Sequence, residues 1–198
     1  MKGHLPTPAQ LPPQMPQLHD GWQRRTCRAV LRMAGWSLVG EFPDAPKLVL
    51  IAAPHSSWWD GMWGLLVKVA VGADVHFMGK QELFFWPLGS LLRRLGGMAI
   101  DRGAAKGVVE QMIDQFRQRE KLWLGIAPEG TRKPVKRWKS GFWRIAHDAG
   151  VPIFTVAFHY PDKTIQLGPL FDTSADMDAD ITRLRAFYAP FKGKHRNV

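Results

Sequence analysis

Cysteine is almost absent from this chain of 198 residues, which contains only Cys27. No disulfide can form within the chain, and such cysteine usage fits a reducing compartment. Cys27 lies between arginines, with no evident base close to it in sequence, so it is a poor candidate for a thiol nucleophile. Chemistry based on a reactive cysteine is therefore disfavoured.

Long apolar runs are also missing. The best run, residues 48–54, has the length of a strand and falls far short of the roughly 18 to 20 residues needed to span a bilayer. Residues 1–20 lack the basic start and apolar centre of a secretory signal and contain five prolines, so we expect a disordered tail there. We expect a cytoplasmic protein that is peripheral on the inner face of the membrane.

Acidic residues are scarce relative to basic ones, with 17 Asp and Glu against 27 Lys and Arg, which gives a net charge of +10. This balance favours a polyanionic partner, such as nucleic acid, anionic lipid headgroups or a phosphorylated substrate. Tyrosine is rare, with two residues against nine tryptophans. Indole rings often collect at bilayer interfaces, although we expect most of these tryptophans to pack in the core.

Residues 22–39 form the first periodic segment, which we expect to be a basic amphipathic helix. Four arginines fall within about 100° of one another on a helical wheel, with apolar residues on the opposite arc. Either an interfacial membrane anchor or an ordinary helix packed on the domain fits this pattern. We assign residues 21–40 to this helix and residues 41–198 to a single globular domain.

Within that domain, short apolar runs alternate with segments of helical periodicity. Strands are expected at residues 47–53, 75–79, 98–100, 122–127 and 151–158, with an edge strand at 165–170. Helices are expected at residues 57–71, 87–95, 104–119, 142–149 and 176–188. This alternation predicts an α/β fold, in which a mostly parallel central sheet is flanked by helices and preceded by the N-terminal amphipathic helix.

The run His55-Ser-Ser-Trp-Trp-Asp60 follows the first strand of the domain, where α/β folds place their sites. On one continuous helix the two side chains would point about 140° apart, so direct pairing requires His55 to lie in the loop before the helix. Pro54 favours that break. Asp60 could then orient the imidazole, which takes a proton from a hydroxyl near neutral pH.

No nucleophile or metal motif accompanies this pair. The chain contains no Gly-x-Ser-x-Gly elbow and no His-Glu-x-x-His sequence, and its other histidines are scattered singly. We therefore expect no metal, and we expect the substrate hydroxyl to be the nucleophile. A lone His-x4-Asp spacing is weak evidence, because simple helix capping can also produce it.

A second polar segment, Glu129-Gly130-Thr131-Arg132, also follows an apolar strand. Gly130 permits an unusual turn, Glu129 can accept hydrogen bonds from hydroxyls, and Arg132 offers a planar fork for phosphate oxygens. A surface turn with a solvated charge pair would explain either charged residue alone. Further charges follow shorter strands at Lys80 and Arg102.

Four segments in this order resemble the motifs of the glycerolipid acyltransferase family: His55-x4-Asp60, the block from Lys80 to Arg102, residues 129–132, and Val151-Pro152-Ile153. The resemblance covers residues 47–160. Three positions depart from the family pattern, namely Pro54, Ala127 and Thr155. None is a proposed catalytic group, but the departures loosen the inference about the acceptor.

This resemblance implies direct acyl transfer from acyl-CoA or acyl-carrier protein to the hydroxyl of a lysophospholipid such as a 1-acylglycerol-3-phosphate, with no other cofactor. It implies that His55 is the base and Asp60 its partner. Residues similar to those that shape the acceptor site are Lys80, Arg102, Glu129, Gly130, Thr131 and Arg132, and Pro152 belongs to a motif credited with acyl-chain binding.

The expected partners are the thioester donor, the lysophospholipid acceptor and an anionic membrane surface, without nucleic acid. Two alternatives stay open. One is an acyltransferase that acts on a non-glycerol lipid acceptor. The other is a nonenzymatic membrane-binding or nucleic-acid-binding protein, which would leave the His55-x4-Asp60 spacing unexplained.

Overall fold

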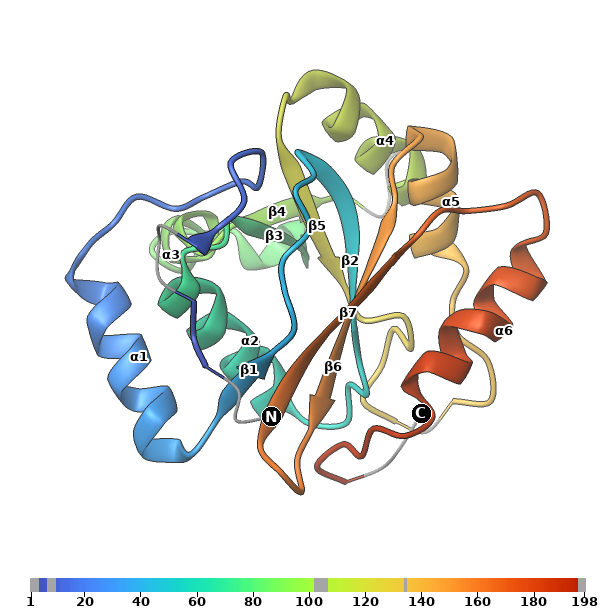
Figure 1. Cartoon of the computed structure of the whole chain (residues 1–198). Helices are drawn as coiled ribbons and strands as arrows, with labels where there is room; N and C mark the ends of the chain where they lie inside the picture. Colours follow the sequence, from blue (N-terminus) through green and yellow to red (C-terminus); the bar gives the residue numbers. More distant parts are fainter. Residues whose placement is uncertain (1–3, 7–9, 102–106, 134, 196–198) are drawn as a thin grey trace.

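The computed structural model describes residues 4–6, 10–101, 107–133 and 135–195, built around a seven-stranded sheet in the order β1-β7-β6-β2-β5-β3-β4 (Figure 1). The strands are β1 Ser37–Val39, β2 Lys47–Ala53, β3 Val75–Lys80, β4 Gly97–Ile100, β5 Leu122–Ile126, β6 Ile153–His159 and β7 Thr164–Phe171. Strands β6, β2, β5, β3 and β4 run parallel, β7 runs antiparallel to β6, and β1 pairs parallel with β7. The predicted mostly parallel sheet is confirmed.

Helices cover both faces of this sheet. They are α1 Trp22–Ala34, α2 Trp58–Val71, α3 Leu88–Arg94, α4 Val108–Gln118, α5 Gly141–Ala149 and α6 Met177–Tyr188, with a short 3-10 helix η2 Gln81–Leu83. Figure 1 shows α1 and α2 on one side of the sheet and α4, α5 and α6 on the other. A hydrophobic core lies on each face of the sheet, and successive side chains of β2 point into opposite cores. Val49 and Ile51 pack toward α4 and α5, whereas Leu48 packs toward α2.

Helix α2 begins and ends at clear local signals. Ser57 is its N-cap and forms a capping box with Asp60, and Gly72 terminates it in the left-handed region with φ 84. In its last turn, buried Lys68 donates to the backbone carbonyls of Val75 and Leu95. Burial lowers the pKa of Lys68, against the opposing effect of Asp74. These contacts hold the end of α2 against the start of β3.

The site-forming edge of the sheet follows from the connections. Neighbouring strands β2 and β5 run parallel. The chain leaves β2 for α2 on one face and leaves β5 for α5 on the other. Where adjacent connections depart to opposite faces, the loops at the carboxyl ends of the strands part and leave a crevice. The loops that carry His55 and Glu129 leave these two strands.

The N-terminal segment differs from expectation. Leu11 and Met15 are buried in the core on the α1 and α2 face, and Gln17 forms an antiparallel bridge with Ala73. The prediction of a disordered tail is therefore wrong for residues 10–20. Two apolar side chains among prolines and polar residues are enough to fix this stretch on the domain, because each buries its surface in an existing core.

The first helix is shorter than expected and orients its arginines differently. It ends before Gly35, which adopts φ 77. Residues 37–39, predicted to continue the helix, form the edge strand β1 instead. Buried Arg24 donates to the carbonyl of Leu18 at 2.9 Å, and Arg28 donates to that of Ala70 at 2.8 Å. Part of the predicted basic face therefore contacts the domain.

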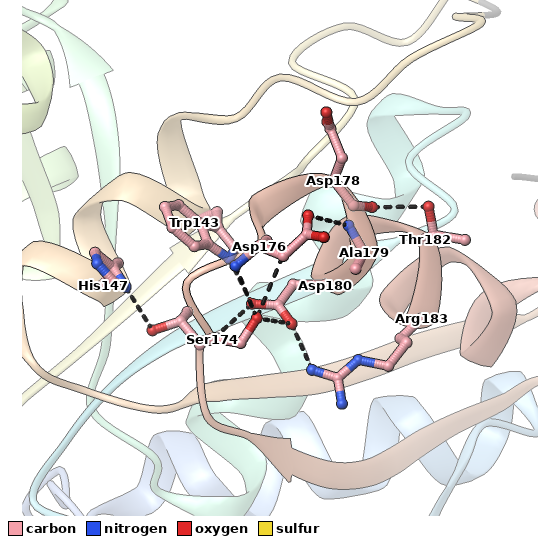
Figure 2. A network of polar contacts seen from close by, with 10 residues as sticks. Trp143, His147, Ser174, Asp176, Asp178, Ala179, Asp180, Thr182 and Arg183 are labelled. Atoms are coloured by element: carbon pink, nitrogen blue, oxygen red, sulfur yellow. Dashed lines mark hydrogen bonds and ion pairs between the residues drawn. The ribbon is translucent and has the colours of Figure 1, made fainter.

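A polar network fastens α6 to α5 (Figure 2). Asp180 accepts hydrogen bonds from Trp143 Nε1 at 2.9 Å, from Ser174 N at 2.6 Å, and from the guanidinium of Arg183. Burial opposes ionisation of Asp180, but these donors outweigh it and lower the pKa of the carboxyl to about 2. The carboxylate therefore stays charged and holds the two helices together.

Candidate active site

His55 and Asp60 lie together at the carboxyl end of β2. His55 is in the loop between β2 and α2, and Asp60 is in the first turn of α2. The distance from His55 Nδ1 to Asp60 Oδ2 is 3.5 Å, and the two side chains are 27% and 0% exposed. The structure thus brings together the two predicted catalytic residues, with the imidazole partly exposed and the carboxylate buried.

The Asp60 carboxylate has several donors around it. Its Oδ2 atom accepts hydrogen bonds from the backbone N–H groups of Ser56 and Ser57, both at 2.7 Å, and its Oδ1 atom accepts one from the hydroxyl of Tyr160. Asp60 therefore caps α2 and also faces the imidazole. The capping explanation left open by the sequence and the orienting role are both compatible with this geometry.

Glu129 ties the loop after β5 to the loop that carries His55. It is buried, and its Oε1 atom accepts a hydrogen bond from the backbone N–H of His55 at 2.8 Å. Gly130 follows with φ 64, and a Cβ atom at this position would lie 2.7 Å from Lys139 Cδ. The predicted need for glycine at this turn agrees with these two observations. A contact of Glu129 with substrate stays a prediction.

The structure describes only some of the other predicted binding residues. Arg132 is exposed on the loop beyond Glu129, and Thr131 Oγ1 accepts from Lys133 N at 3.2 Å. Lys80 ends β3 at the same edge of the sheet, but its side chain lies outside the described part of the structure, and Arg102 lies outside the described residues altogether.

Pro152 lies at the other end of the sheet. It precedes β6, which runs parallel to β2, and its carbonyl accepts from Val49 N at 3.0 Å near the start of β2. His55 follows the opposite end of β2, roughly 20 Å away at the rise of an extended strand. The structure does not bring Pro152 together with His55, so its assignment to acyl-chain binding has no support from this geometry.

Both serines of the loop have backbone partners. Ser56 Oγ accepts from the N–H of His195 at 3.2 Å, and Ser57 Oγ accepts from that of Trp59 at 3.2 Å. These bonds fix the loop and the start of α2. The expectation that the acceptor hydroxyl is the nucleophile stays a prediction.

The sequence did not predict that Tyr160 and the C-terminal segment lie at this site. Tyr160 directly follows β6, and its N–H donates to the carbonyl of Lys192 at 2.9 Å. Further along this segment, Lys194 Nζ lies 5.0 Å from the centre of the Trp59 ring. The only signal was a polar aromatic residue at a strand end, because contacts between residues this far apart depend on sheet topology.

An apolar cavity of about 670 Å³ opens beside His55 and Asp60. His55 and Asp60 belong to its lining, which is otherwise dominated by aliphatic and aromatic side chains of α2 and the sheet, among them Leu65, Val67, Phe158, Ile165 and Leu167. Gly61 and Gly64 line it from α2. This volume falls in the range of small-molecule sites and suits an extended apolar group.

Exposed aromatic residues lie beside the loop that carries His55. Trp58 is 53% exposed, and its ring stacks on that of Trp59 with 4.1 Å between centroids.

Among the described residues, no helix combines the length and apolar character that crossing a bilayer requires. Within the same part of the chain, no three His, Cys, Asp or Glu side chains gather as a metal site would need.

Residues 41–159, more than half of the chain, match the sequence model of the acyltransferase family. The chain therefore belongs to this family, and the membership predicted from the four motifs is confirmed.

Two curated relatives carry the name 1-acyl-sn-glycerol-3-phosphate acyltransferase, one from Neisseria gonorrhoeae and one from Neisseria meningitidis serogroup B (strain ATCC BAA-335 / MC58). Each is 27% identical to this chain over 128 residues, which are 62% of this chain and 48% of the relative. This chain thus spans about half the length of the curated relatives that it matches.

A similar fold occurs in the crystal structure of the 1-acyl-sn-glycerophosphate (LPA) acyltransferase, PlsC, from Thermotoga maritima. The two structures superpose with a TM-score of 0.59 at 16% identity, over 86% of this chain and 80% of that one. This likeness concerns the fold.

Proposed function

We propose that this chain transfers a fatty acyl group from a thioester to the hydroxyl of a lysophospholipid, with His55 as general base and Asp60 as its orienting partner. The observation that carries the proposal is the position of the His55 imidazole, which lies between a buried carboxylate and an apolar cavity. Family membership and the names of the curated relatives support the same chemistry.

The proposed reaction is a direct displacement. With Nδ1 of His55 against Asp60, Nε2 takes the proton as the acceptor oxygen attacks the thioester carbonyl. The new C–O bond forms, the C–S bond breaks, and the thiolate leaves with a proton returned by His55. No covalent acyl-enzyme is needed, which accords with the structural roles of Ser56 and Ser57.

A phosphate-bearing acceptor suits the polar side of the site. Arg132 is exposed on the loop after β5, and Lys139 lines the cavity together with His55. Both cations can bind phosphate oxygens through charge-assisted hydrogen bonds. We propose an acceptor similar to 1-acylglycerol-3-phosphate, with acyl-CoA or acyl-carrier protein as donor and no further cofactor.

We also propose that the protein works on the inner, cytoplasmic surface of an anionic membrane. Trp22 and Met33 on α1 are 71% and 81% exposed, and Trp58 is exposed beside the catalytic loop. Exposed indole rings on a chain of net charge +10 suit an interface of anionic lipid and water. The lysophospholipid acceptor would be available there, and the soluble thioester donor would reach the site from the cytoplasm.

The test is incubation of the purified protein with labelled acyl-CoA or acyl-carrier protein and a panel of lysolipids, followed by identification of the products by mass spectrometry. The panel contains 1-acylglycerol-3-phosphate, lysophospholipids with larger headgroups, and a non-glycerol lyso-lipid. We expect the diacyl product of the phosphate-bearing acceptor. Absence of acyl transfer to every acceptor would contradict the proposal, and transfer to the non-glycerol lipid alone would replace the acceptor.

A further inference from the structure

We propose that Tyr160 is a positioning residue of this site, which holds the Asp60 carboxylate in the orientation that serves His55. The inference rests on the proposed function and extends it to a residue outside the matched family segment, which ends at position 159. Tyr160 directly follows β6, the strand that pairs with β2 in register up to Ala53. The pairing brings Tyr160 beside the loop that begins after Ala53.

The two oxygens of Asp60 have different partners. Oδ2 accepts from two backbone N–H groups and faces His55 Nδ1, whereas Oδ1 accepts from the hydroxyl of Tyr160. Bonds to Oδ2 alone leave the carboxylate able to rotate about the Cβ–Cγ bond. A donor on Oδ1 fixes the plane of the group as well, so the oxygen that faces the imidazole stays in place.

Tyr160 is itself held by packing. Its ring meets the buried ring of Trp36 edge-on with 5.1 Å between centroids, and its backbone N–H donates to the carbonyl of Lys192. Because packing already fixes this donor, little further conformational entropy is lost when the catalytic geometry forms. The hydroxyl therefore supports Asp60 before substrate binds.

The phenol remains a donor over the whole working pH range. Burial, the hydrogen bond to Asp60 and the negative charge of that carboxylate raise the pKa of Tyr160 far above that of an ordinary tyrosine. Changes in the pH dependence of the reaction therefore cannot come from Tyr160 losing its own proton. They report on the groups that it orients.

Several other charged or titratable groups lie on the segments next to His55. They are Asp60 on α2, Glu129 at the backbone N–H of His55, Lys139 in the cavity lining, and Lys194 and His195 of the C-terminal segment near Trp59 and Ser56. A comparison of two proteins that differ only at Tyr160 leaves all of these groups in place. The difference then isolates the hydroxyl.

Tyr160→Phe keeps the ring against Trp36 and removes only the hydroxyl. Without that donor, more of the negative charge of Asp60 acts on the imidazolium, and the carboxylate is held less firmly. We expect kcat to fall roughly tenfold, because a hydrogen bond to a charged group is lost, with KM values for donor and acceptor changed less than about twofold. We expect the acid limb of the kcat/KM profile to move to higher pH.

Tyr188→Phe is the matched control. Its hydroxyl is buried, donating to the carbonyl of Ile51 at 2.7 Å and accepting from Val156 N at 3.1 Å. Loss of this hydroxyl should lower Tm at least as much as Tyr160→Phe does. It should leave the position of the acid limb unchanged, which separates positioning from a general loss of stability.

A second measurement does not depend on activity. In protein labelled with ¹³C at the histidine rings, the His55 signal is assigned by its loss in His55→Asn and is then titrated by NMR. We expect its midpoint to be higher in Tyr160→Phe than in wild type and unchanged in Tyr188→Phe. Equal midpoints in wild type and Tyr160→Phe would overturn the inference, as would an unchanged kcat. If wild type transfers no acyl group to any lysolipid, the proposed function fails while the titration still decides the role of Tyr160.

Discussion

Replacement of Asp60 by asparagine separates its role as a helix cap from its proposed role as the partner of His55. As a helix cap, Asp60 accepts from the N–H groups of Ser56 and Ser57 at 2.7 Å. An amide oxygen can still accept from them, but without charge assistance and without a favourable interaction with the helix dipole. We expect a loss of about 1 to 2 kcal/mol in the free energy of unfolding.

In the proposed mechanism, Asp60 matters far more for the rate as the partner of His55. The neutral amide no longer stabilises the imidazolium that forms when His55 takes the proton, and its NH₂ group competes for the place of Oδ2. A positioned general base contributes about 10²- to 10⁴-fold, so we expect kcat of Asp60→Asn to fall by about this factor. This corresponds to about 3 to 5 kcal/mol of transition-state stabilisation, which exceeds the capping loss.

Ser57→Ala is the control for capping alone. It removes the hydroxyl that accepts from Trp59 N but leaves the carboxylate and its distance to the imidazole unchanged. We expect about 1 kcal/mol of destabilisation and kcat within about twofold of wild type. The assay is initial-rate kinetics well below Tm, with thermal melts of all three proteins. If Asp60→Asn melts earlier but keeps kcat near the wild-type value, Asp60 is a helix cap only.

Three further predictions concern the acceptor, the α5–α6 network and the membrane. Arg132→Ala should raise KM for a phosphorylated acceptor roughly tenfold and that for the donor much less, because a charge-assisted hydrogen bond to phosphate is lost; equal effects in steady-state kinetics would assign Arg132 a structural role. The pKa of Asp180 is about 2 in the folded protein, below the value near 3.9 in an unfolded chain. Its contribution to stability, about 2 kcal/mol, is therefore complete above pH 4 and lost as the pH falls toward 2, so the difference in unfolding free energy between wild type and Asp180→Asn should shrink over that window in denaturant titrations. A gap that does not change with pH would contradict this reasoning. Trp22→Ala combined with Met33→Ala, two exposed positions on α1, should reduce sedimentation with anionic vesicles several-fold while leaving Tm unchanged; equal sedimentation would leave α1 as a packing element.

The sequence predicted the central part of the fold well, because local signals there agree with the tertiary structure. The apolar run from Lys47 to Ala53 is β2 with the predicted bounds, and Pro54 separates it from α2, as the His55 loop required. Strand and helix periodicities also located most of the later elements to within a few residues. Each segment buries its apolar face where its own period places it.

The failures lie where tertiary contacts decide the structure. Strand β1 has three residues and follows a helix, so its apolar residues resembled a continuation of the helical pattern, although Gly35 marks the end. Arg24 and Arg28 face the domain because backbone carbonyls there accept their hydrogen bonds, which no helical wheel reveals.

The site was predicted in its parts but not in its connections. His55 and Asp60 are close in sequence, so their spacing alone suggested the contact. The bond from Glu129 to the His55 backbone and the bond from Tyr160 to Asp60 join segments separated by 74 and 100 positions. Both depend on β2 lying between β5 and β6, an order of strands that no local pattern encodes.

The central claim, that His55 is the general base of an acyl transfer, is tested most directly by single-turnover transfer of labelled acyl groups by purified His55→Ala. His147→Ala is the control. His147 lies on α5, where it stacks on Trp143 and contacts Thr173, and it has no proposed role in the reaction. We predict that His147→Ala keeps the wild-type rate, whereas His55→Ala, folded by its melting curve, loses about 10²-fold or more. Near wild-type transfer by folded His55→Ala would contradict the account.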